Sequence, residues 1–326
     1  MIREVDLTRP ALLLSSGQEI LIENLSIFKS LNNPSTCNVV IPLNSINNIR
    51  IGSLWSVNVW VDGEYKLVFY GVLKEVKNAF DSINLSFEGP LSFLDYFHIE
   101  SSEDEIIYNE GTNISNVIND LVSKSQFGNS LPIRNYFSGK LGAELRISYG
   151  QTLGDAIREV VDLFGGFIAE IISNRDVEIW LSSISNLSSN NVNYDKDLVI
   201  NEFISETSNH LYRVIYIRSD TGQEIDTQNH STIIKKISNI WVPYPFSRRA
   251  IYYTYKSSLT KEQAIAIANS IEQRLKVGRY TYSISYASLL DCQLMDKING
   301  YVVDSININY SLEPINLTTT ITGFSL

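Results

Sequence analysis

The stretch that decides the fold class is residues 54–73, LWSVNVWVDGEYKLVFYGVL. Apolar side chains alternate with polar ones from Trp55 to Val61, which is the period-two pattern of a strand that buries one face. Asp62 and Gly63 follow, and both tolerate the positive φ that a tight hairpin turn requires. Residues 66–73 supply a return strand. The stretch therefore predicts an antiparallel hairpin in a sheet with one dry face and one face open to water or to a partner.

Further strand patterns occupy both ends of the chain. Residues 36–41 form an apolar run that ends at a proline, and residues 82–88 alternate strictly between apolar and polar side chains. Three more strands are predicted at the C-terminal end, over residues 280–286, 301–310 and 315–324. The prevailing pattern is therefore that of a mainly β protein.

The middle of the chain has helical patterns instead. Apolar residues recur at helical spacing from Ile114 to Val122. Thr152, with an acidic residue three positions later, can cap a second helix that ends at Gly165, and a short strand pair follows at 167–181. A third helix is predicted between Thr260 and Gly278. We therefore expect a mainly β fold with an α+β insertion.

Composition and pattern together suggest three domains in a chain of 326 residues. We expect a strand-rich domain at 1–97, an α/β bridging module at 98–185 and a second strand-rich domain at 186–326. An acidic run from His98 to Gly111, without Lys or Arg, is typical of a solvated linker. Residues 233–278 have two possible placements, in the second strand-rich domain or against the α/β module.

The overall composition excludes several classes of function. With 44% hydrophobic and 19% charged residues, the chain has no signature of disorder. A formal net charge of −10 opposes direct binding of DNA or RNA phosphates. The first residues lack the apolar stretch of a signal peptide, so we expect none, and no apolar run approaches the ~20 residues of a membrane-spanning helix. We expect synthesis in the cytoplasm and no stable membrane insertion, with Cys37 and Cys292 as buried, reduced thiols.

The sequence contains no motif of a catalytic, metal or cofactor site. His98, His210 and His230 lack a partner at zinc-ligand spacing. Gly139-Lys140 lacks the earlier glycine of a phosphate-binding loop, and the glycines at 165 and 166 follow a helix rather than precede one. We therefore predict that the chain is not an enzyme, with no catalytic residue, no metal and no cofactor. A glycan hydrolase built from two of the 36 acidic residues stays open as an alternative.

One segment combines basic and aromatic residues, between Trp241 and Tyr255, where Arg248 and Arg249 lie among Tyr and Phe residues. Three interpretations stay open: the segment meets an acidic partner surface, binds a glycan, or is an ordinary loop. The glycan interpretation would make the protein an adhesin that stacks sugars on aromatic rings.

The order of these elements resembles the baseplate hub family of contractile-tailed phages, which extends to the front half of secretion-system spike proteins. The similar residues are Gly52, Val57–Gly63, Phe69–Val72, Phe87–Leu91 and Leu94 in the first block, Gln151–Ile157 and Leu163–Phe167 in the module, and Gly300–Ile306 and Thr318–Gly323 at the end. The resemblance covers most of the chain.

This resemblance implies two tail-tube-like antiparallel β-barrel domains bridged by the α/β module. It also implies a homotrimeric ring that joins a sixfold tail tube to a threefold spike and passes DNA or cargo without binding it specifically. The expected partners are the tail tube protein, the tape-measure protein and a separate spike protein, since no spike or lysozyme domain follows Leu326, and the expected location is the virion tail baseplate. We expect acidic residues such as Glu64, Glu88 and Asp304 to approach the lumen and repel DNA. The main alternative stays the glycan-binding adhesin.

Overall fold

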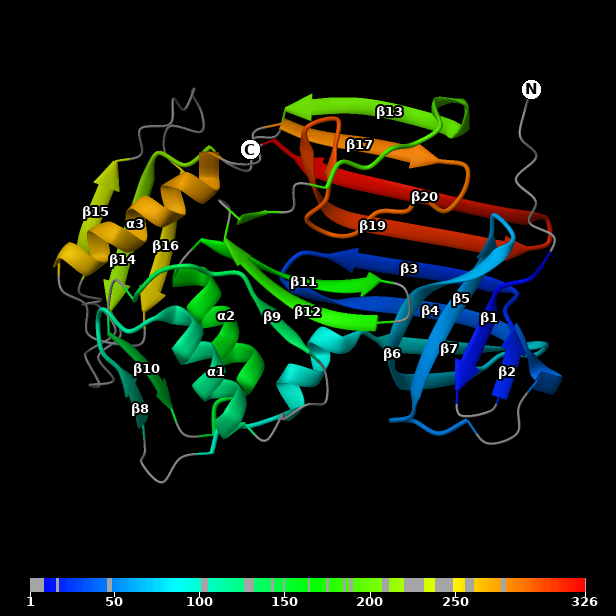
Figure 1. Ribbon diagram of the computed structural model, residues 1–326, viewed down its shortest axis with the longest axis horizontal. Helices are drawn as coiled ribbons and strands as arrows, with labels where there is room; N and C mark the ends of the chain where they lie inside the picture. Colours follow the sequence, from blue (N-terminus) through cyan, green and yellow to red (C-terminus); the bar gives the residue numbers. More distant parts are fainter. Residues whose placement is uncertain are drawn as a thin grey trace.

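The computed structural model describes residues 9–15, 18–45, 49–100, 105–125, 132–141, 144–148, 150–163, 165–173, 176–183, 186–187, 190–206, 211–219, 232–237, 249–255, 261–276 and 280–325. A 12-stranded sheet dominates the molecule (Figure 1). An α/β module lies beside this sheet, and a separate three-stranded sheet with one helix lies at the margin. The expected class, mainly β with an α+β insertion, is confirmed.

The first part of the chain supplies one end of the large sheet. Its strands are β1 (Leu12–Ser15), β2 (Gln18–Leu21), β3 (Asn24–Ser30), β4 (Asn33–Pro42), β5 (Leu54–Val61), β6 (Glu64–Asn78) and β7 (Ser82–Glu88), with 3₁₀ turns at Leu43–Ser45 and Pro90–Tyr96. The predicted hairpin is the β5–β6 pair, and Asp62 and Gly63 have φ angles of 54° and 89°. The alternation that predicted this hairpin also places Val57 and Val59 in the core.

The C-terminal strands continue the same sheet. They are β13 (Val199–Glu206), β17 (Tyr280–Tyr286), β18 (Lys297–Ile298), β19 (Tyr301–Leu312) and β20 (Ile315–Phe324), and a 3₁₀ turn at Lys196–Leu198 precedes β13. The junction between the two parts is the antiparallel pairing of β19 with β3, from Ser305 opposite Ser30 to Ser311 opposite Asn24. The two strand-rich blocks therefore share one sheet and one hydrophobic core. The domain limits at 97 and 185 stay a prediction.

The α/β module has its own core. It contains β8 (Glu105–Tyr108), α1 (Ile114–Lys124), β9 (Ile133–Asn135), β10 (Leu145–Ser148), α2 (Leu153–Leu163), β11 (Gly166–Ser173) and β12 (Asp176–Ser183). The Thr152 hydroxyl accepts a hydrogen bond from the amide of Asp155 at 3.0 Å, which is the predicted cap of α2. Part of the predicted acidic linker is instead strand β8, because Ile106 is buried where β8 pairs with β10.

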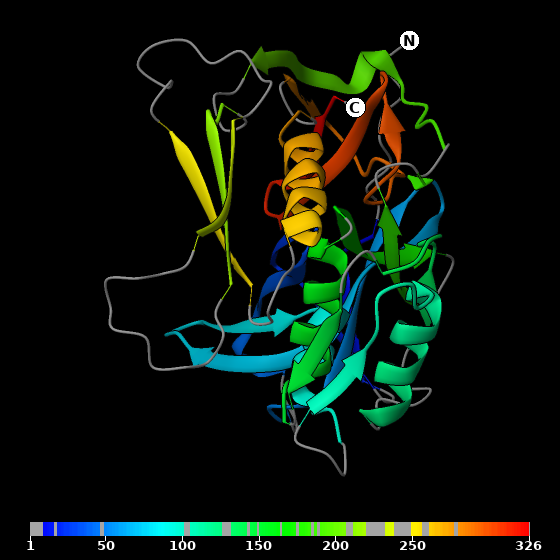
Figure 2. The same ribbon diagram turned by 90° about the vertical axis from the view of Figure 1, so that its left-hand side faces the viewer.

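The third unit is a sheet of β14 (Val214–Ser219), β15 (Thr232–Ile237) and β16 (Ala250–Tyr255), covered by α3 (Lys261–Lys276). Ile215 and Ile217 pack against Ala264, Ala268 and other apolar residues of α3 in a separate core. In Figure 2 this small sheet stands at the margin, with α3 on its inner side. Segment 233–278 thus contributes to a core of its own as far as it is described.

Candidate functional site

One face of the large sheet is an almost uncharged surface of hydroxyl and amide side chains, which we call the polar face. These residues alternate with the core residues of β3, β4, β7, β17, β19 and β20. The polar face consists of Asn24, Ser26, Ser30, Thr36, Asn38, Ser82, Asn84, Ser86, Thr281, Ser283, Ser285, Ser305, Asn307, Asn309, Ser311, Asn316, Thr318, Thr320 and Thr322. Phe28 and Val40 interrupt it.

Backbone register aligns these side chains in continuous rows across the β3–β19 junction. One row runs from Thr318 through Asn309, Ser26 and Asn38 to Ser86, so it crosses strands from both ends of the chain. Many of the groups satisfy one another: Ser86 donates to Asn38 at 2.8 Å, and the hydroxyls of Ser305 and Thr322 lie 2.6 Å apart. The surface is therefore polar but has few charged groups and no strong electrostatic potential.

The expected acidic lumen residues do not lie together. Glu88 is at the end of β7 on the polar face, where Lys74 forms an ion pair with it at 3.2 Å. The carboxylate of Asp304 accepts a hydrogen bond from Thr322 at 2.5 Å, and burial raises the pKa of Asp304. Glu64 lines a cleft elsewhere on the molecule. The polar face is thus nearly neutral rather than strongly acidic.

The strands that carry the polar face lie between two free edges, one on β13 and one on the second half of β6. Among the described residues, strand β13 pairs with β17 alone, and its Ile200, Phe203 and Ile204 are 61%, 51% and 59% exposed. At the other end, β6 pairs with β5 over residues 64–72 and with β7 over residues 72–78. Residues 74–78 therefore have no paired neighbour on their second side within the described chain. Unpaired edges offer rows of backbone donors and acceptors to another chain.

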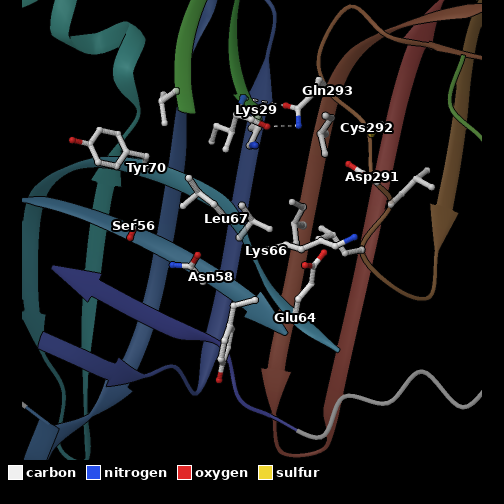
Figure 3. A pocket seen from close by; sticks show the side chains of 18 of the residues that line it. Lys29, Ser56, Asn58, Glu64, Lys66, Leu67, Tyr70, Asp291, Cys292 and Gln293 are labelled. Atoms are coloured by element: carbon white, nitrogen blue, oxygen red, sulfur yellow. Dashed lines mark hydrogen bonds between the residues drawn. The ribbon is translucent and has the colours of Figure 1, made fainter. Parts of the chain in front are cut away.

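A cleft of about 1450 Å³ opens on the opposite side of the sheet, between the β5–β6 hairpin and residues 289–293 (Figure 3). Lys29, on β3, lies at its floor and is only 4% exposed. Burial lowers the pKa of Lys29, and the negative charge of Glu170 partly offsets that effect. Cys37 and Cys292 are free, buried thiols, as predicted, and burial raises the pKa of each.

Glu170 ties the α/β module to the large sheet. Its side chain on β11 is 1% exposed and accepts hydrogen bonds from the Ser35 hydroxyl, from the Ser35 amide at 3.3 Å and from the Leu91 amide at 2.7 Å. A Cβ atom on Gly89 would collide with Ser35 and with this carboxylate, so the close approach requires glycine. Burial raises the pKa of Glu170, although these hydrogen bonds oppose the shift.

Two further contacts complete this attachment, which we call the β11 junction. The Ile168 amide donates to the Asn32 side chain at 2.8 Å, and the Asn32 amide donates to the Ile168 carbonyl at 2.8 Å. Gln293, in the C-terminal part, donates to the Ile172 carbonyl at 2.6 Å. Strand β11 therefore contacts both parts of the large sheet through side-chain hydrogen bonds.

The residues considered as catalytic or metal-binding candidates form no such site where they are described. The His98 ring contacts the Gly150 carbonyl at 2.9 Å, a structural contact, whereas His210 and His230 lie outside the described residues. Among the described residues no group of His, Cys, Asp and Glu could hold a metal ion, and no helix is long and apolar enough to cross a membrane. Trp241 and Arg248 also lie outside the described residues, but Arg249 and Tyr252 do not.

No family model matches this sequence, and no curated protein matches it. Solved structures do. The 43 kDa tail protein of prophage MuSo2 from Shewanella oneidensis superposes with a TM-score of 0.67 at 12% identity, over 97% of this chain and 98% of that one. A tail protein from Neisseria meningitidis gives a TM-score of 0.63 at 11% identity, over 97% and 96%. The chain has a phage tail protein fold.

The tail protein fold extends to secretion systems. A type VI secretion component from E. coli, described as similar to the T4 tail proteins gp27 and gp5, has a TM-score of 0.56 at 8% identity. It is covered over 76% of its length, and this chain over 97%. The resemblance to the hub family that the sequence suggested is thus confirmed at the level of fold.

Proposed function

We propose that the chain is a structural hub subunit of a phage tail baseplate or a related injection machine. Three copies form a ring that joins the sixfold tail tube to a threefold spike and passes DNA or cargo. The tail tube protein, a separate spike protein and the tape-measure protein are its partners, and it acts in the virion without catalysing a reaction. The likeness of 97% of the chain to two tail proteins supports a structural role of this kind.

The observation that carries the ring is the pair of free edges on one sheet. Strand β13 at one end exposes three large apolar side chains, which cost free energy in water. Addition of the free part of β6 from the next copy would satisfy backbone groups on both edges and cover those side chains. Pairing these edges in turn closes a ring.

The polar face then becomes the lining of the ring. The core and the α/β module occupy the other side of the sheet, so closure through the edges leaves the hydroxyl and amide rows facing the channel. A lining of this type offers neither basic groups that retain phosphate nor an apolar surface that retains protein. It suits passage without specific binding.

The ring is tested by mass in solution and by one pair of variants. The wild-type protein is expected to show three times the 36.9 kDa mass of one chain, and threefold rings in electron micrographs. Ile204→Lys places an unpaired charge in the closed edge and is expected to weaken assembly at least about ten-fold.

Ile107→Lys is the matched control, because Ile107 is a comparably exposed strand residue, at 48%, outside the proposed interface. It should leave the ring mass unchanged. A wild-type protein that stays monomeric at all concentrations, or equal loss of assembly in both variants, would contradict the proposal.

A further inference from the structure

The cleft of about 1450 Å³ runs beside an open edge of β6. Strand β6 pairs with β5 over residues 64–72, and its pairing with β7 on the opposite side begins at residue 72. Residues 64–71 thus have one side that pairs with no strand of the described chain. Residues 64–68 all line the cleft. Side chains of consecutive strand residues point to alternate faces, so an unbroken run of this kind means that β6 presents its edge to the cleft.

The walls of the cleft offer an extended chain both apolar and uncharged polar contacts. The buried side chains of Ile306 and Ile308 on β19 contribute to its lining, as do the amides of Asn190, Asn191 and Gln293. The charged lining residues are Arg9, Lys29 and Lys66 together with Glu19, Glu64, Asp291 and Asp296. The cleft as a whole therefore has no excess of positive charge, and an anionic group would be held only where a cation lies close to it.

One end of the cleft is closed beside Lys29. Gln293 donates to the Ile172 carbonyl at 2.6 Å and accepts from the Ile172 amide at 3.3 Å, which joins residues 289–293 to β11. Lys29, Cys292 and Gln293 lie together at this end, and Glu64 lies at the other (Figure 3). A chain that extends along β6 therefore meets β11 and Lys29 and stops there. The closed end favours a chain terminus over an internal segment.

Lys29 supplies a cation at the closed end. Its side chain is 4% exposed, and within the described chain its ammonium forms no ion pair and donates no hydrogen bond. Glu170 attracts it from a distance, but that carboxylate accepts its hydrogen bonds from Ser35 and Leu91 instead. A buried ammonium without an acceptor is costly, and a bound carboxylate would supply one.

The geometry points to the extended C-terminal tail of a partner protein as the occupant of this cleft, added as a strand to residues 64–68 of β6 with its terminal carboxylate at Lys29. Strand addition to an open edge gives affinity through main-chain hydrogen bonds, and capture of a terminal carboxylate fixes the register. At about 3.3 Å per residue, this edge accommodates a tail of about five residues. The cleft is separate from the edges that are proposed to close the ring, so its test does not depend on ring formation.

The test screens a synthetic library of random octapeptides against the full chain, in one form with a free C-terminal carboxylate and in another with a C-terminal amide. Peptides with the free carboxylate should bind, and the amidated forms of the same sequences should bind at least about ten-fold more weakly. Lys29→Met should remove this preference. Lys140→Met is the matched control, because it removes an exposed lysine of the α/β module and should leave affinity unchanged.

A second measurement uses the wild-type chain alone and so does not depend on how Lys29→Met folds. An added strand bonds to the amides of every second residue of the strand beside it. Binding of a selected peptide should therefore slow hydrogen exchange of alternate amides within residues 64–68 at least about ten-fold and leave residues 74–78 of the same strand unchanged. N-methylation of alternate peptide amides should abolish binding in one of its two frames and retain it in the other.

Three results would overturn the proposal. The first is that no peptide with a free carboxylate binds the full chain. The second is that amidated peptides bind as tightly as those with the free carboxylate, or that Lys140→Met weakens binding as much as Lys29→Met. The third is that a bound peptide leaves hydrogen exchange within residues 64–68 unchanged.

Discussion

The β3–β19 junction and the β11 junction join parts of the same molecule by different means. The first is a backbone ladder over an apolar core, in which Ile27, Ile306 and Ile308 are almost fully buried. The second adds a few buried polar side chains, above all Glu170, to the contacts that Phe167, Ala169 and Ile171 make with the core of the large sheet. In a backbone ladder many equivalent hydrogen bonds share the stabilising free energy, so substitution of one side chain on the polar face should change the stability little. Where one buried carboxylate accepts several of the hydrogen bonds, a single substitution or a change in pH has a large effect on the free energy of unfolding.

Removal of the carboxylate gives the largest expected effect. Glu170→Ala leaves the donors of Ser35 and Leu91 buried without an acceptor, and we expect the free energy of unfolding to fall by about 3–5 kcal/mol. Denaturant titration measures this change. Glu105→Ala, which removes an exposed ion pair with Arg146, should cost no more than about 1 kcal/mol. Equal losses in the two variants would show that the β11 junction does not depend on its carboxylate.

The same carboxylate should make the β11 junction sensitive to pH. Because burial raises the pKa of Glu170 above its value of 4.5 in the unfolded chain, the folded state binds the proton more tightly. Its contribution to stability is therefore fully present below pH 4.5 and is lost as pH rises through the raised pKa. Relative to Glu170→Gln, the wild type should lose stability over this interval with a slope of at most about 1.4 kcal/mol per pH unit.

Burial lowers the pKa of Lys29 and the negative charge of Glu170 opposes that shift, so the contribution of Lys29 must be separated. The comparison is therefore repeated in a Lys29→Met background, by denaturant titration between pH 4 and pH 7. If the slope disappears together with Lys29, the effect belongs to the lysine and the assignment to Glu170 is wrong.

Substitutions of Asn32 are expected to have the smallest effect, and they separate the loss of a hydrogen bond from backbone strain. It has a φ of 65° and accepts the hydrogen bond from Ile168. Asn32→Ala loses this bond and adds left-handed strain, for an expected loss of about 1–3 kcal/mol. Asn32→Gly loses the bond without the strain and should be less destabilised by about 1 kcal/mol. If the two variants are equally stable by thermal and urea unfolding, backbone strain contributes nothing at this position.

The same contrast explains what the sequence could predict. The β5–β6 hairpin and the Thr152 cap are local, because the residues that form them lie within a few positions of one another. The β3–β19 junction joins residues far apart in the chain, and no local pattern records such pairing. Strand β13 was not predicted, since its apolar residues Ile200, Phe203 and Ile204 do not alternate and its side chains are exposed.

The candidate site escaped prediction for a related reason. Asn and Ser are common in turns as well as on the polar faces of strands, and only the register across six strands shows that these residues form one surface. Glu170 lies 135 positions from Ser35, so nothing in the sequence near either residue indicates their contact. The sequence singles out the basic and aromatic segment, but the stacking of its Tyr252 on Tyr216 of β14 depends on the parallel pairing of β14 with β16, which no local pattern shows.

The polar face also has a consequence for movement along a channel. In a ring closed through β13 and β6, a sliding molecule would meet hydroxyls and amides that already bond to one another, as Ser86 does to Asn38. Such a wall would bind neither water nor a passing molecule tightly at any one place. Friction with water, rather than binding to the wall, would then resist sliding. Transit would then depend weakly on salt and on the charge of the cargo, and one lining would serve a nucleic acid and a polypeptide equally well.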